Sequence, residues 1–322
     1  MEISNPILVE LTRNGAIESF HRGAAAVMDA SCNLHFSLGD IERPIFLRSS
    51  AKPLQAIPLL RSGAELSDAE IALACGSHSG SLLHTKTVAA WLARLGLSEA
   101  DLECGAHIPL DKEEAARLIR EGQKPCSLHN NCSGKHAGFL TLAQKLGAPT
   151  KGYIAPNHPV QQTVSGAIAE FCGTDLLELP CGTDGCGIPA HALPLRSLAL
   201  GVARLATEKA DWAARLRSSM ANHPEMVAGE GYFDTVFMRR VAPRILCKRG
   251  AEGVLIAMWP EKGLGLALKI DDGAGRASEI AMAALLKYLG AASAQELDGY
   301  LKAPLLNVAG KSIGIIHPAS GF

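Results

Sequence analysis

The chain has 322 residues, which is long enough for one large domain or two lobes with a sizeable core. Hydrophobic residues make up 48%, charged residues 20%, and 31 basic residues balance 32 acidic ones, so no basic surface for nucleic acid is indicated. The N-terminus lacks a signal-peptide pattern, and no apolar run is long enough to cross a bilayer. We therefore expect a cytoplasmic enzyme.

The first part of the chain has the pattern of β-strands. Residues 7–12 lead through the hairpin signal Asn14-Gly15 into residues 17–21. Segments 24–28 and 34–38 would continue this meander. The pattern predicts antiparallel strands at the N-terminal end of the chain.

The middle of the chain has mostly helical patterns. Ser67 and Glu70 have capping-box spacing ahead of residues 71–74. Apolar residues recur with helical spacing in segments 82–95, 112–121, 136–146, 160–171, 195–205, 212–220 and 278–289. These segments predict a largely helical region between the strands of the two chain ends.

Strand patterns return near the C-terminal end. Segments 253–258 and 264–270 predict a hairpin around residues 260–263, and segment 312–317 predicts a last short strand. Strands at both ends enclosing helices predict an α/β (α+β) fold. An antiparallel sheet from both chain ends would be flanked by helices, with a helical lobe between them. We expect a single two-lobed domain over residues 1–322.

A serine precedes a lysine by one helical turn where a helix is expected to begin. Ser49 and Lys52 would share a helix face, which would bring the amine to the hydroxyl. A lysine in an apolar, cation-rich pocket loses its charge readily and can act as general base for a serine nucleophile. Alternatively, Ser49 or Ser50 only caps a helix with Pro53 in its first turn, and the spacing alone favours this cap.

The cysteine count argues against a disulfide framework. The chain has 9 cysteines, an odd number, without an export signal. Cys75 and Cys172 are expected to be small buried hydrophobes. Cys132 and Cys186 instead lie in loops rich in glycine and polar residues, but they are too far apart to form a metal-binding spacing motif.

Several segments together resemble the L-asparaginase II family of the thermolabile, rhizobial type. These segments, which occur in the same order as in the family, are residues 47–53, 76–80, 129–138, 184–189, 248–253 and 267–274. The resemblance extends over nearly the whole chain. It implies a fold similar to serine β-lactamases, penicillin-binding proteins and glutaminases, which agrees with the sheet expected from both chain ends.

The resemblance implies two catalytic serine–lysine pairs. One pair corresponds to Ser49 and Lys52, and the other to Ser77 and Lys248. Lys269 is the alternative to Lys248. The family also implies a homodimer and Zn²⁺ beside the substrate pocket. The zinc ligands would correspond to Cys132, Lys135 and Cys186, with a fourth position left open.

The implied activity is hydrolysis of L-asparagine to L-aspartate and ammonia. Ser49 would attack the side-chain amide after Lys52 takes its proton, although the roles of Ser49 and Ser77 could be inverted. Candidates for binding the substrate are Arg48 for its α-carboxylate, Asp184 for its α-ammonium group, and His78 and Asn131 as further pocket residues.

Three other functions remain open. A glutaminase would differ by one methylene in its substrate. A β-lactamase or penicillin-recognising carboxypeptidase would also suit the serine–lysine spacing, but its targets lie outside the cytoplasm. A non-catalytic sensor would use Cys132 and Cys186 to hold a regulatory metal, although no recognisable partner-binding segment accompanies them.

Overall fold

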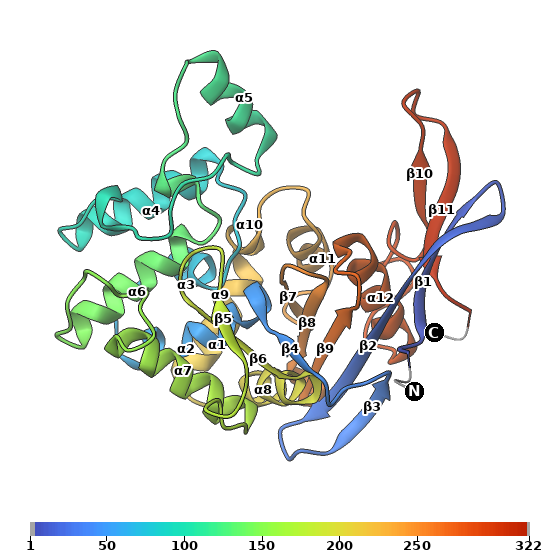
Figure 1. The fold of residues 1–322 in the computed structure, drawn as a ribbon, viewed down its shortest axis with the longest axis horizontal. Helices are drawn as coiled ribbons and strands as arrows, with labels where there is room; N and C mark the ends of the chain where they lie inside the picture. Colours follow the sequence, from blue (N-terminus) through green and yellow to red (C-terminus); the bar gives the residue numbers. More distant parts are fainter. Residues whose placement is uncertain (1–3, 321–322) are drawn as a thin grey trace.

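The computed structural model describes residues 4–320, in which a large sheet lies beside a group of helices (Figure 1). The sheet has eight strands in the order β10-β11-β1-β2-β9-β8-β7, and β3 also pairs with β2. Every pairing is antiparallel. The strands are β1 (Ile7–Arg13), β2 (Ala16–Asp29), β3 (Leu34–Leu38), β7 (Leu246–Arg249), β8 (Val254–Trp259), β9 (Leu264–Ile270), β10 (Ala303–Leu306) and β11 (Ser312–Pro318).

Both chain ends contribute to this one sheet, which confirms the predicted fold class. Strand β1 lies between β2 and β11, with Val9 opposite Pro318. Strand β2 differs from the prediction, because the expected segments 17–21 and 24–28 form one continuous strand. Its first half pairs with β1 and its second half with β3 and β9, so one long strand connects two parts of the sheet.

The helical patterns are also confirmed. At the start of α3, Ser67 Oγ accepts the Glu70 N–H and the Glu70 carboxylate accepts the Ser67 N–H, as a capping box requires. The helices are α1 (Lys52–Gln55), α2 (Ile57–Arg61), α3 (Asp68–Ala74), α4 (Leu82–Arg94), α5 (Lys112–Arg120), α6 (Ser133–Lys145), α7 (Pro159–Cys172), α8 (Leu195–Thr207), α9 (Asp211–Asn222), α10 (Pro224–Val227), α11 (Phe233–Val241) and α12 (Gly275–Tyr288).

Helices cover both faces of the sheet centre. All residues of β8 are buried, and because successive side chains of a strand point to opposite faces, both faces must be covered. Helices α8 and α12 both pack against β8 and β9. A Cβ atom at Gly265 of β9 would lie 2.2 Å from Ala199 O, so α8 approaches this strand more closely than any side chain would allow.

A small second sheet brings two distant segments together. It has three strands in the order β4-β6-β5, formed by β4 (Pro44–Phe46), β5 (Cys181–Thr183) and β6 (Pro189–Pro194). This pairing places the chain that follows β4 beside the turn between β5 and β6. Within residues 4–320, no helix is long and apolar enough to span a membrane. The division into two lobes stays a prediction.

Candidate active site

The segments singled out in the sequence converge around a short helical entry. Residues Arg48–Ala51 form a 3₁₀ helix that leads directly into α1. The turn between β7 and β8 lies against this helix, because a Cβ atom at Gly250 would be 2.9 Å from Ser50 N and 3.3 Å from Ser49 N. Only glycine allows this approach, which brings residues far apart in sequence to Ser49.

Lys52 is almost completely buried beside the partly exposed Ser49. Its Nζ donates to Gly76 O at 2.6 Å and to Asn131 O at 3.2 Å. Burial, reinforced by Lys135, lowers the pKa of Lys52 against the opposing effect of Cys132. Within residues 4–320, no hydrogen bond joins Lys52 Nζ to Ser49 Oγ.

The helix-capping alternative for the two serines receives no support from these contacts. The residue preceding α1 is Ala51, and neither α1 nor the 3₁₀ helix has a side-chain cap. Ser50 Oγ instead donates to Leu47 O at 2.6 Å. Ser49 is therefore the serine whose hydroxyl is left for another role.

Next to Lys52 lies a cluster of two thiols and a second lysine. Lys135 Nζ donates to Cys186 Sγ at 3.1 Å, and Cys132 Sγ, which donates to Asn131 Oδ1 at 3.1 Å, lies near Cys186. Cys186 and Lys52 lower the pKa of Cys132 against the effect of burial, whereas Cys132 and burial raise the pKa of Cys186. Burial lowers the pKa of Lys135, but Cys132 and Cys186 outweigh burial and raise it above its usual value.

The two thiols of this cluster have the donor chemistry that zinc prefers, whereas the raised pKa of Lys135 opposes its coordination. Thiolates are preferred zinc ligands, and three donors leave the fourth tetrahedral position open. Among the described residues, no group of three or more His, Cys, Asp or Glu side chains could hold a metal ion. The predicted set reaches three donors only through Lys135, which must give up its proton to coordinate.

Arg48 and Asp184 form an ion pair at the entrance to this cluster. Arg48 Nη2 lies 3.1 Å from Asp184 Oδ1, and its Nη1 lies 4.0 Å from Glu252 Oε1. The backbone φ of Arg48 is 49°, a left-handed conformation that is strained for a non-glycine residue and often marks functional sites. Burial would raise the pKa of Asp184, but Lys135, the Gly185 N–H and Arg48 lower it.

The residues of the second predicted pair are both buried at their polar atoms. Ser77 Oγ has no hydrogen-bond partner within residues 4–320, and Lys248 has no exposed surface. Burial lowers the pKa of Lys248 to about 7. Lys269 is more exposed, and its Nζ donates to Glu252 O at 2.8 Å. Burial lowers the pKa of both lysines, and Lys248 is the more deeply buried of the two.

His78 and Asn131 are fixed by contacts within the protein. His78 Nδ1 accepts the Gly80 N–H, its Nε2 lies 2.9 Å from Ser133 Oγ, and the ring is fully buried. No ring nitrogen of His78 is therefore left for a substrate. Asn131 supplies its carbonyl to Lys52, and its N–H donates to His107 Nε2 at 2.9 Å. The sequence did not indicate this use of His107.

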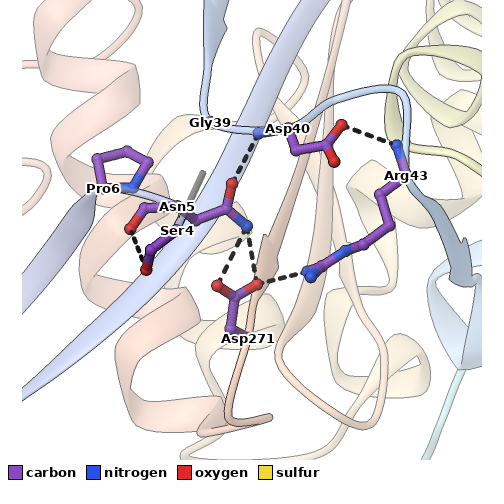
Figure 2. Close-up of a pocket in the computed structure, with 7 residues that line it drawn as sticks. All are labelled: Ser4, Asn5, Pro6, Gly39, Asp40, Arg43 and Asp271. Atoms are coloured by element: carbon purple, nitrogen blue, oxygen red, sulfur yellow. Dashed lines mark hydrogen bonds and ion pairs between the residues drawn. The ribbon is translucent and has the colours of Figure 1, made fainter. Parts of the chain in front are cut away.

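Two cavities differ in their relation to this site. The larger, of about 890 Å³, is lined by none of the predicted site residues, and its polar residues bind one another: Asn5 and Arg43 both donate to Asp271 (Figure 2). The smaller, of about 310 Å³, opens beside Arg48. Its lining residues are Phe46, Arg48, Gly182, Thr183, Ala190, Glu252 and Lys269. We place the candidate site at the smaller cavity.

Comparison with solved structures finds distant similarities. The structure of Mglu in its native form is 14% identical, with a TM-score of 0.47 over 87% of this chain and 68% of Mglu. A β-lactamase from Mycobacterium bovis is 16% identical, with a TM-score of 0.42 over 83% of this chain and 94% of that one. A β-lactamase from Burkholderia ambifaria is 19% identical, with a TM-score of 0.39 over 85% and 96%.

Comparison by sequence gives a clearer result. No curated protein matches the chain significantly. The model of the family described as L-asparaginase II matches residues 9–318, which span the first strand to the last. This match includes the serine–lysine segments, the cysteine-bearing loops and the β7–β8 turn. The chain therefore belongs to the L-asparaginase II family.

Proposed function

We propose that the protein is an L-asparaginase that hydrolyses the side-chain amide of L-asparagine through an acyl-enzyme on Ser49. The observation that carries the proposal is the buried Lys52, three residues after the partly exposed Ser49, in the segment that follows Arg48 of the smaller cavity. Family membership supports the same activity. A serine, a desolvated amine and a charged entrance are the groups that amide hydrolysis of an amino acid requires.

The contacts of Lys52 suit a general base. A neutral amine has two N–H donors and one lone pair. Nζ donates to Gly76 O and Asn131 O and also contacts Cys132; in the neutral form its two N–H groups would keep the carbonyl partners, and the lone pair would accept the Ser49 proton. Ser49 Oγ then bonds to the amide carbon, the C–N bond breaks, and ammonia leaves with that proton. Water hydrolyses the resulting β-aspartyl ester and restores Ser49.

The second pair would assist the proton transfers. Lys248 can exist as a neutral amine near pH 7, so it can carry a proton between Ser77 and the leaving group or the attacking water. The inverted assignment, with Ser77 as nucleophile, uses the same residues. Trapping an acyl group on Ser77 rather than Ser49 would establish the inversion.

Zinc and substrate binding complete the proposal. Cys132, Lys135 and Cys186 would hold Zn²⁺, which when bound supplies positive charge beside the substrate pocket. Arg48 would bind the α-carboxylate through its planar fork, and Asp184 the α-ammonium group. Arg48 and Asp184 form an ion pair with each other in the structure. The zwitterionic substrate would replace that pair with one contact from its carboxylate to Arg48 and one from its ammonium group to Asp184.

A substrate panel tests the proposed activity. Purified wild-type protein, with zinc present, is assayed for ammonia release from L-asparagine and L-glutamine and for opening of a chromogenic cephalosporin. We expect kcat/KM for asparagine to exceed that for glutamine by about 10- to 200-fold, the usual effect of one methylene. Equal or better use of glutamine would make the protein a glutaminase, and cephalosporin hydrolysis alone would contradict the proposal.

The cytoplasmic location and the homodimer are further proposals. They rest on the sequence pattern and on family membership. Light scattering coupled to size-exclusion chromatography tests the assembly, because one chain has a mass of 33.8 kDa and a dimer would have twice that. A mass of one chain at assay concentration would contradict the dimer.

A further inference from the structure

Asp234 is a buried carboxylate outside the segments that suggested the function. It lies on α11 and has no exposed surface. Its Oδ1 accepts the Arg249 N–H at 2.7 Å, and its Oδ2 lies 3.0 Å from Arg249 Nε. Burying a carboxylate is unfavourable unless it is paired and hydrogen-bonded, so its place beside β7 requires a compensating interaction.

The position of β7 explains part of this contact. Strand β7 is the last strand of the sheet and pairs only with β8 among the described residues. N–H groups on the outer edge of such a strand lack a strand partner. The Asp234 carboxylate accepts the Arg249 N–H in place of a neighbouring strand. It therefore fixes the outer edge of β7 at Arg249, the residue after Lys248.

We propose that Asp234 is a positioning residue for Lys248: it holds the N–H and guanidinium of Arg249, whose carbonyl accepts from the Lys248 amine, and it adds a negative charge to the surroundings of that amine. The inference rests on the proposed function, because Lys248 acquires a catalytic role only there. It assigns Asp234 no contact with the substrate. It predicts instead that the charge of Asp234, rather than its shape alone, determines how Lys248 titrates.

The charges around Lys248 come from several elements. Asp234 of α11 is the acidic one, whereas Lys52 of α1 and Arg249 of β7 are cationic, and the thiols of Cys75 and Cys132 also lie near. Burial lowers the pKa of Lys248, Asp234 opposes that effect, and Lys52 and Arg249 add to it. Removing the Asp234 charge should therefore lower the pKa of Lys248 further.

Glu279 provides a matched control. Its Oε1 lies 3.2 Å from Arg249 Nη1, so it binds the same guanidinium from α12. It is not among the main influences on Lys248. Asp234→Asn and Glu279→Gln each remove one carboxylate charge from Arg249 with little change of shape, but only the first removes a main charge acting on Lys248.

The test is an NMR titration of protein with ¹³C-labelled lysine, in which Lys248→Met identifies the Lys248 signal. We expect Asp234→Asn to lower the pKa of Lys248 by about one unit, the size of effect typical of a nearby charge, and Glu279→Gln to leave it unchanged. The pH midpoint of kcat/KM for asparagine should move by the same amount. An unmoved Lys248 signal in Asp234→Asn, or an equal shift in Glu279→Gln, would overturn the proposal.

A second variant covers the case in which Asp234→Asn does not fold. Arg249→Met removes a cation near Lys248 and leaves the Asp234 charge unbalanced, so the pKa of Lys248 should rise. No change, or a fall, would contradict the role of Asp234. The NMR result does not depend on turnover. If the protein released no ammonia, the proposed function would fail while the charge coupling could still be measured.

Discussion

At the residue scale, the protonation state of Lys52 decides whether Ser49 can become a nucleophile. The side chain is almost completely buried, which favours the neutral amine, whereas its contact with Cys132 favours the ammonium form. Replacing Lys52 with methionine keeps a similar volume but removes the lone pair. We expect kcat to fall by about 10²- to 10⁴-fold, the usual contribution of a general base.

The control for this variant is Lys145→Met, at the exposed end of α6. It should retain wild-type kcat, and circular dichroism should show both variants to be folded. A folded Lys52→Met protein with near-normal kcat would mean that another group takes the Ser49 proton.

Lys248 gives the protein a pH dependence with a defined sign. Its pKa is lowered from 10.5 to about 7, so the neutral amine increases as the pH rises through 7 and kcat/KM should rise with it. Between pH 7 and 10.5 the unfolded state holds the proton and the folded state does not, so stability also rises with pH there. Lys248→Met should flatten both profiles. Unfolding in urea at pH 6 and pH 9 measures the second effect, and an unchanged rise in the variant would contradict it.

Zinc binding is tested most directly at Cys186. Cys186→Ser should reduce the zinc content of the purified protein by about 10-fold or more, because a weak hydroxyl donor replaces a thiolate. Cys181→Ser, on the exposed strand β5, should keep the wild-type content. Elemental analysis after dialysis gives the comparison. Equal zinc in wild type and Cys186→Ser would remove this cysteine from the ligand set.

Some of these residues could be predicted from the sequence and others could not. The spacing of Ser49 and Lys52 leaves a local signal, because one helical turn brings them together. Cys132 and Cys186 carry no spacing signal, and only the family resemblance singled them out. Asp234 and His107 act through contacts with chain segments distant in sequence, Arg249 and Asn131, which no local pattern encodes.

At the scale of the element, segment length determined what could be predicted. The periodicity of apolar residues can be recognised only in longer elements, such as helices α4 and α8 and strands β8 and β9. Strands β4, β5, β7 and β10 have only three or four residues, so their pattern could not be distinguished from a loop. The omission of β7 matters because this strand carries Lys248.

The contact of α8 with β9 provides a stability test. A side chain at Gly265 would clash with the α8 backbone at Ala199 and Ala203, so Gly265→Val should lower the free energy of unfolding by about 1–3 kcal/mol or more. Gly166, on the exposed face of α7, has open space at its Cβ position, and Gly166→Ala should raise the free energy of unfolding by up to about 1 kcal/mol. Urea unfolding measures both. A Gly265→Val protein of wild-type stability would show that α8 lies farther from β9.

At the scale of the whole molecule, the site forms because strands from the end of the chain pair with strands from its beginning. Pairing of β2 with β9 and of β9 with β8 carries the β7–β8 turn to Ser49, about two hundred residues away in sequence. The sequence predicted a sheet from both chain ends but not this strand order. Hydrophobic periodicity indicates which face of a strand is buried, but it does not indicate which strands lie next to each other. The convergence of the motifs is therefore a result of the tertiary structure.

The central claim is a serine amidohydrolase whose nucleophile is Ser49. We would measure ammonia release from L-asparagine by the wild type, Ser49→Ala and Ser50→Ala under identical conditions. Ser50 is the matched control because its hydroxyl is buried and bonded to Leu47 O. We expect robust release by the wild type and Ser50→Ala, and a loss of about 10³-fold or more in folded Ser49→Ala. Release that survives in Ser49→Ala, or is absent from the wild type with zinc present, would contradict it.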